Sequence, residues 1–252
     1  MRRTITRRRT TIESALRTHL PEAFDRSPEE LLELDRPRLQ GQVFLALVDG
    51  FGHDRPLEDV VPIAAALELV SLQRRLHRVA VDQSRRTGDH PTDDVLVGDL
   101  LESKAFELTT GFDAEPELVE RCFAVLVEAT RSTQEGEWVL TAPKAESETP
   151  DRVDDRRLGA VTGCAAEIAA LIADIDSHRE LARKASALGV RVRRYRDDGR
   201  LPADRERFPA DRSAWIEPIL ESCPPTARAP VRDQLSAILA ESLDREPTDP
   251  IA

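Results

Sequence analysis

The residues best placed to do chemistry together are the charged side chains between positions 67 and 106. Arg78 and Asp82 stand four positions apart, so on a helix they share one face and form an ion pair. Mg²⁺ prefers several hard carboxylate oxygens, and a lone carboxylate beside its own guanidinium partner repels the ion rather than binding it. The pair therefore predicts a poor metal site and, in its simplest interpretation, a solvated ion pair.

Other common catalytic patterns are missing from the sequence. The histidines form no HExxH motif and no metal-ligand spacing, and there is no Gly-rich phosphate loop or GxSxG elbow. His77 is interpreted as a structural residue, and Trp138 and Trp215 as packing residues. The three cysteines are odd in number and widely spaced, which favours small buried side chains over disulfides or a zinc site.

Helical periodicity dominates the elements that must position these residues. Apolar residues spaced by three and four predict helices over 61–79, 115–129 and 231–243, and another that starts at Thr149-Pro150. Ser27-Pro28-Glu29-Glu30 has the pattern of a capping box. With no convincing strand pattern, the sequence predicts an all-α, single-domain bundle of roughly eight to ten helices.

Composition restricts the class of protein further. The 252 residues are 40% apolar, and 47 acidic against 36 basic side chains give a net charge of −11, which argues against sequence-independent binding to nucleic acid. Arg outnumbers Lys heavily, as in halophilic or GC-rich sources. No apolar run is long enough to span a membrane, and no apolar segment follows the basic N-terminus, so we expect a cytoplasmic protein. The expected organisation is a flexible basic segment over 1–10, a helical domain over 11–245 and a flexible tail over 246–252.

The run ALELVSLQRRLHRVAVDQSRRTGDHPT, followed by VLVGDLLESKAF, resembles the polyprenyl synthetase family, the trans-isoprenyl diphosphate synthases. That family shows an EL…LxHDDxxD helix, an Arg-Arg-Gly turn, a Pro-Thr pair and a GDxL…A helix. The match is ungapped from Glu68 to Thr92, and Gly98-Asp99-x-Leu101 follows at the right distance. Later segments (RLGAV, AAEIAALIADID and LARKASALGVRV) resemble later family helices. The resemblance implies a multi-helix bundle of the isoprenoid synthase type.

The resemblance also implies a reaction, which joins an allylic diphosphate to isopentenyl diphosphate. In that reaction Mg²⁺ ions on two Asp-rich motifs hold the leaving pyrophosphate. Here Arg78 and Asp82 stand at the outer positions of the first motif, with Val79 where its second Asp belongs. The second motif is reduced to Asp197 and Asp198, displaced by one position among four arginines and followed by Gly199. If any residues bind a metal, they are Asp82, Asp197 and Asp198.

Four arginines fall near family positions that bind diphosphate. They are Arg38, Arg85, Arg86 and Arg157. Guanidinium groups suit phosphate oxygens, so these arginines could hold a diphosphate without metal. The simpler interpretation is a set of solvated arginines in an Arg-rich protein.

The favoured hypothesis is a polyprenyl-synthetase-like protein of isoprenoid biosynthesis that has lost both Mg²⁺-binding motifs. It would need no cofactor, could bind an isoprenoid diphosphate, and would act as a non-catalytic or regulatory partner of an active prenyl diphosphate synthase, as a homodimer or heterodimer. The small residues of 165–170 could allow close packing between subunits. Two alternatives stay open: an active prenyltransferase with atypical Mg²⁺ ligands, and an acidic helical interaction module with no small-molecule site.

Overall fold

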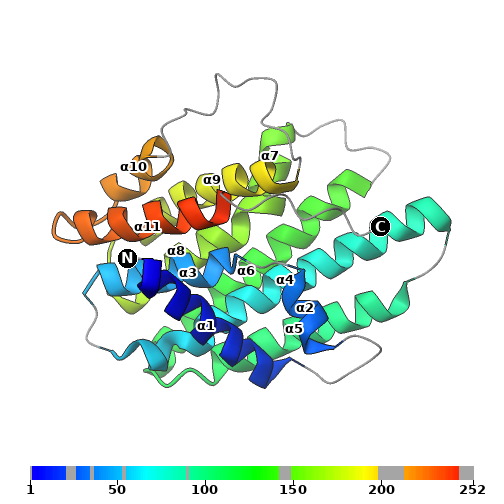
Figure 1. Cartoon of the computed structure of the whole chain (residues 1–252), viewed down its shortest axis with the longest axis horizontal. Helices are drawn as coiled ribbons and strands as arrows, with labels where there is room; N and C mark the ends of the chain where they lie inside the picture. Colours follow the sequence, from blue (N-terminus) through cyan, green and yellow to red (C-terminus); the bar gives the residue numbers. More distant parts are fainter. Residues whose placement is uncertain are drawn as a thin grey trace.

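The computed structural model describes residues 2–20, 27–34, 37–52, 55–88, 91–141, 149–197 and 213–243, and these form helices and short connections without a strand. The helices are α1 Arg2–His19, α2 Pro28–Glu33, α3 Leu39–Gly50, α4 Leu57–Thr87, α5 Thr92–Thr110, α6 Pro116–Thr141, α7 Pro150–Asp154, the π-helix η2 Asp155–Gly159, α8 Ala160–Ile172, α9 His178–Asp197, α10 Ser213–Glu221 and α11 Arg228–Leu243. They pack into one bundle (Figure 1), which confirms the all-α prediction.

Helix α4 carries the stretch in which the sequence predicted chemistry. Acidic residues occupy its first turn and Arg85 and Arg86 its last, so the charged side chains at both ends interact favourably with the helix dipole. It ends at Gly88, whose φ of 74° is left-handed and whose N–H donates to the Ser84 carbonyl. The predicted helix over 61–79 lies inside it. The predicted capping box is also confirmed, because the Ser27 hydroxyl and the Glu30 carboxylate each accept the other's backbone N–H.

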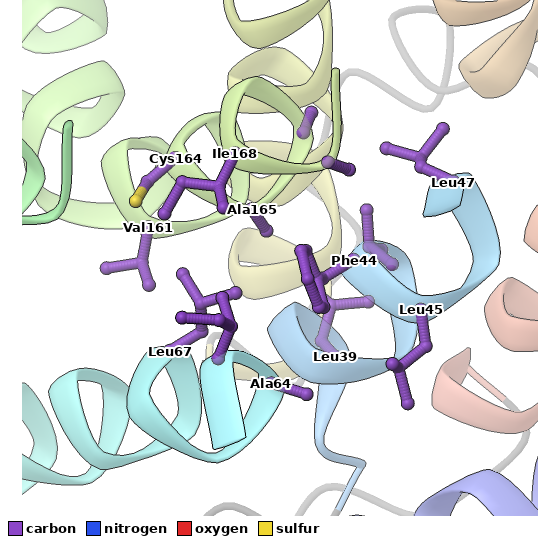
Figure 2. Packing of buried hydrophobic residues seen from close by; sticks show 14 of the residues in the cluster. Leu39, Phe44, Leu45, Leu47, Ala64, Leu67, Val161, Cys164, Ala165 and Ile168 are labelled. Carbon is purple, nitrogen blue, oxygen red and sulfur yellow. The ribbon is translucent and has the colours of Figure 1, made fainter. Parts of the chain in front are cut away.

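The core lies where α3, α4 and α8 meet (Figure 2). Phe44 of α3, Leu67 of α4, and Ala165 and Ile168 of α8 are fully buried there. Every residue from Leu39 to Val48 is buried, as expected for a helix surrounded by other helices. Aliphatic side chains supply most of this core, consistent with the low aromatic content.

The expectation that residues 165–170 pack between subunits is not supported by their position. Ala165, Ala166, Ala169 and Ala170 are all buried inside the bundle. Their small side chains let α8 lie close to its neighbours within the chain: at Gly163, a Cβ would lie only 3.0 Å from the Ala182 carbonyl oxygen of α9. The flexible tail expected over 246–252 lies outside the described residues, as do residues 142–148 and 198–212.

The N-terminal segment differs from the sequence prediction. Residues 2–10 are helical, whereas we expected a flexible basic segment over 1–10. Ile5 and Arg8 are buried, and the Arg8 guanidinium donates to the Asp49 carboxylate of α3 and to the Gln234 amide oxygen of α11, both at 2.6 Å. The basic residues therefore attach α1 to the bundle, a role that charge alone could not indicate. None of the helices in the described residues has an apolar stretch long enough to cross a bilayer.

We expect Arg8→Ala to lower the free energy of unfolding by about 1–3 kcal/mol, because it leaves a partly buried carboxylate without its cation. Urea denaturation measures this change. Arg7→Ala, at an exposed position of the same helix, removes the same charge and should change stability by no more than about 0.5 kcal/mol. Equal effects of the two substitutions would contradict the role assigned to Arg8.

Cys122, Cys164 and Cys223 are free thiols and all are buried, as predicted. Burial raises the pKa of Cys122 to about 12 and that of Cys223 to about 11, and raises the pKa of Cys164 well above its usual value. The neutral thiol is thus the form present in the folded protein near neutral pH.

Because these pKa values lie well above 8, the Cys122 and Cys223 thiols are almost entirely protonated at pH 8. We therefore expect a thiol reagent such as dithionitrobenzoate to leave the native protein unlabelled while all three cysteines react in urea. Rapid labelling of the native protein would show that at least one thiol is more accessible than the structure indicates.

Candidate functional site

A cavity of about 270 Å³ lies between the second half of α4 and the end of α6. Its charged lining residues are Arg74, Arg78, Asp82 and Arg85 from α4 and Glu137 from α6. On α4 these residues follow one another at intervals of three and four, so one face of the helix presents them together. The stretch singled out by its chemistry in the sequence therefore does border a cavity.

Glu137 is the centre of the charge arrangement. Its Oε1 lies 3.4 Å from Arg74 Nη1 and 3.9 Å from Arg157 Nη1, and its Oε2 lies 3.7 Å from Arg78 Nη1. The Arg74 side chain is only 4% exposed, and those of Arg157 and Glu137 are 14% and 20% exposed. Three guanidinium groups from two separate segments thus share one poorly solvated carboxylate.

A second layer of ion pairs continues from Arg157. Its Nη2 donates to Asp154 at 3.0 Å, and Arg194 of α9 binds the same carboxylate at 2.6 Å and that of Asp151 at 3.0 Å. Burial, the Asp151 carboxylate and the Asp154 carboxylate raise the pKa of the neighbouring Asp155, while Arg194 opposes them. Helices α7, α9 and η2 are therefore joined electrostatically beside the cavity.

The π-helix η2 brings Arg157 to this place. The sequence predicted one continuous helix from Thr149-Pro150, whereas the π turn of 155–159 separates α7 from α8. At Gly136 of α6 a Cβ would lie 2.9 Å from the Arg157 backbone nitrogen. The lack of a side chain at Gly136 lets the two backbones approach closely, which places Arg157 within reach of Glu137, the next residue on α6.

The predicted ion pair between Arg78 and Asp82 is present, with Arg78 Nε 3.4 Å from Asp82 Oδ2. Val79, at the other position of the first motif, is half-buried and does not line the cavity.

The carboxylates that line the cavity, Asp82 and Glu137, both lie within 4 Å of a guanidinium. Across the described residues no group of three or more His, Cys, Asp or Glu side chains could hold a metal ion. This donor set does not fit Mg²⁺. The Asp197 side chain and all of Asp198 lie outside the described residues.

His77 belongs to a polar group on the α5 side of the cavity. Its Nε2 lies 3.2 Å from the Val95 carbonyl oxygen and 3.3 Å from Asp99 Oδ1, and its Nδ1 lies 3.3 Å from the Gln73 amide nitrogen. Glu102 accepts hydrogen bonds from Gln73 and from Gln134 of α6. Burial, together with Asp99, raises the pKa of Glu102. His77 lines the cavity and contacts α5, and its interpretation as a structural residue stays a prediction.

The four predicted diphosphate ligands are not brought together. Arg38 is buried away from the cavity lining, donating to the Leu32 carbonyl and lying 3.7 Å from Glu13. Arg86 donates to the backbone carbonyl of Asp82 and does not line the cavity. Arg85 does line it, with Nη2 3.4 Å from the Leu140 carbonyl oxygen, and Arg157 reaches it only through Glu137.

Sequence reasoning missed Glu137 and Arg74 as residues of the site. The predicted helix over 115–129 was too short, because α6 continues to Thr141. The positions Ala129, Thr133 and Glu137 continue its buried stripe at intervals of four, and this could have extended the prediction. The interpretation of Trp138 as a packing residue is wrong, since it is 68% exposed at the cavity, whereas Trp215 is buried as expected.

No family model matches the chain. The chain is 27% identical over 201 residues to a geranylgeranyl diphosphate synthase of Methanosarcina mazei, covering 74% of this chain and 61% of that protein. It therefore matches about three fifths of the length of that curated relative. A geranyltransferase structure from Helicobacter pylori superposes with a TM-score of 0.71 at 14% identity, over 97% of this chain and 98% of that one.

A mint structure is also similar, a deletion mutant of a heterotetrameric geranyl pyrophosphate synthase. Its TM-score is 0.65 at 17% identity, over 94% of this chain and 99% of that one. Together these comparisons confirm the resemblance to the polyprenyl synthetase family and the isoprenoid synthase fold.

We expect Gly136→Ala to destabilise the protein by about 1–3 kcal/mol, because the new methyl group would push α6 away from η2. The sign is diagnostic: at an uncrowded helical position the same change would stabilise by up to about 1 kcal/mol. Urea denaturation measures the effect. Glu135→Ala, on the exposed side of the same turn, is the control and should stay within about 0.5 kcal/mol of the original protein.

Proposed function

We propose that this chain is a non-catalytic, polyprenyl-synthetase-like partner of an active prenyl diphosphate synthase. The observation that carries the proposal is the pairing of both cavity carboxylates with arginines, Asp82 with Arg78 and Glu137 with three guanidiniums. Ionising an allylic diphosphate needs cations that hold the leaving pyrophosphate. Carboxylates already neutralised in this way do not recruit Mg²⁺.

The partner role is supported by the assembly in which one protein of this fold is found. The mint synthase to which the chain is similar is described as heterotetrameric, so a chain of this fold occurs in an assembly with a second kind of subunit. A partner subunit needs the fold and its surface but not the metal ligands. The expected assembly is a heterodimer with an active synthase, or a homodimer.

The two alternative hypotheses differ in the residues and the cavity that they require. An active prenyltransferase would need Mg²⁺ ligands from Asp82, Asp99, Asp197 and Asp198. The fold similarity to a geranyltransferase over nearly the whole chain supports this second hypothesis. An acidic interaction module would need no cavity beside Arg78 and Asp82, so the cavity found there counts against it.

We expect the purified chain, incubated with geranyl diphosphate, isopentenyl diphosphate and Mg²⁺, to form no product above a protein-free control. Radiolabelled isopentenyl diphosphate makes the measurement sensitive, and a known synthase serves as the positive control. Turnover that Asp82→Ala abolishes would contradict the proposal and support the active enzyme. Turnover that survives Asp82→Ala would contradict it as well, and would point to other metal ligands.

The partner itself is tested by pull-down from the native source with the tagged chain. We expect a full-length prenyl diphosphate synthase to be recovered and its rate or product length to change when the chain is added. A tagged Arg7→Ala variant, which changes one exposed charge on α1, serves as the control and should recover the same synthase. Failure to recover any synthase would leave the partner role without support.

A further inference from the structure

Apolar side chains gather at the rim of the cavity. Val81 is 37% exposed, Leu140 46% and Trp138 68%, and all three line the cavity between α4 and α6. Large exposed apolar side chains that cluster at a concave site, with charged groups around them, commonly mark a binding surface. The rim therefore offers apolar contact to a ligand.

Most of the charged groups at and beside the cavity are joined in ion pairs. The ion pairs described above join Arg74, Arg78, Arg157 and Arg194 with Asp82, Glu137, Asp151 and Asp154. Within these pairs four positive charges are matched by four negative charges, while Arg85, the other arginine that lines the cavity, lies 3.4 Å from the Leu140 carbonyl oxygen. Glu137 contributes most to this balance because it contacts three of the four guanidiniums.

These ion pairs disfavour a diphosphate at Arg74 and Arg78. An anion that approached Arg74 or Arg78 would come close to the Glu137 and Asp82 carboxylates, where repulsion between like charges is strong in a poorly solvated site. Arg74 is almost fully buried, so it cannot turn to meet the anion without giving up its contact with the Glu137 carboxylate. An uncharged molecule would disturb none of these pairs and would cover the exposed rim.

We propose that this cavity binds a small, uncharged, largely apolar molecule in preference to a diphosphate, and that Glu137 is the residue that sets this specificity. The volume of about 270 Å³ lies just below the ~300–1,000 Å³ of typical ligand pockets, so the ligand is small. The inference deepens the proposed function by naming the ligand class of a non-catalytic chain. It concerns the isolated chain and needs no partner.

The test compares geraniol, a short prenyl alcohol, with geranyl diphosphate in the absence of Mg²⁺. Binding is followed by the fluorescence of Trp138, whose exposed ring should shift to shorter wavelength when a ligand covers it, and by calorimetry. We expect saturable binding of geraniol and a Kd for geranyl diphosphate that is about tenfold higher or more. Equal or tighter binding of geranyl diphosphate, or no binding of geraniol, overturns the proposal.

Glu137→Gln removes the negative charge while keeping the shape of the side chain. It should strengthen binding of geranyl diphosphate by about tenfold or more and leave geraniol binding within about twofold. Glu135→Gln makes the same charge change on the exposed side of α6 and should alter neither Kd. If the two variants behave alike, Glu137 does not set the specificity.

Because Glu137→Gln removes the carboxylate beside the buried Arg74 guanidinium, it could fail to fold. Trp138→Ala is then the second variant: its exposed position makes it safe for folding, and it should weaken geraniol binding by about fivefold or more in calorimetry. Unchanged geraniol affinity in this variant overturns the proposed binding place. These results do not depend on turnover or on recovery of a synthase, so this inference and the proposed function can fail separately.

Discussion

The contact between the Glu137 carboxylate and three guanidinium groups is the interaction on which the candidate site depends. Arg74 and Arg157 are largely buried, and a buried cation is tolerated only beside a compensating anion. Glu137 supplies that anion and joins α4, α6 and the π-helix η2 across one side of the cavity. Its removal would leave Arg78 beside Asp82 and Arg157 beside Asp154, but would take a carboxylate away from the buried Arg74.

The packing of the helices brings the Glu137 carboxylate and the guanidinium groups together. The close approach at Gly136 brings the η2 backbone against α6, and the π turn directs Arg157 toward Glu137. On the other side, the buried helices α3 and α8 hold α4 in place, so its charged face stays turned toward α6. The same chain regions that give the bundle its stability therefore also determine the arrangement of charge.

In a metal-dependent prenyltransferase, carboxylates gather cations that in turn hold pyrophosphate. Here the cavity between α4 and α6 is arranged in the opposite sense, with arginines gathered around carboxylates of the protein itself. The fold is that of the isoprenoid synthases.

The sequence by itself was enough to determine the helical class, the capping box at Ser27, the burial of the cysteines and the Arg78–Asp82 pair. Each of these depends on residue type and on spacing within a few positions, and local geometry translates that spacing directly into structure. The family resemblance of 66–106 likewise depended on a local run of residues.

Only the tertiary structure decided that Arg8 attaches α1 to α3 and α11, that Arg38 is buried away from the cavity, and that Arg157 meets Glu137. These contacts join residues far apart in the chain, so no local pattern reveals them. The sequence could not distinguish a buried arginine from a solvated one, because the cost of burying a charge is offset only by partners that folding brings near.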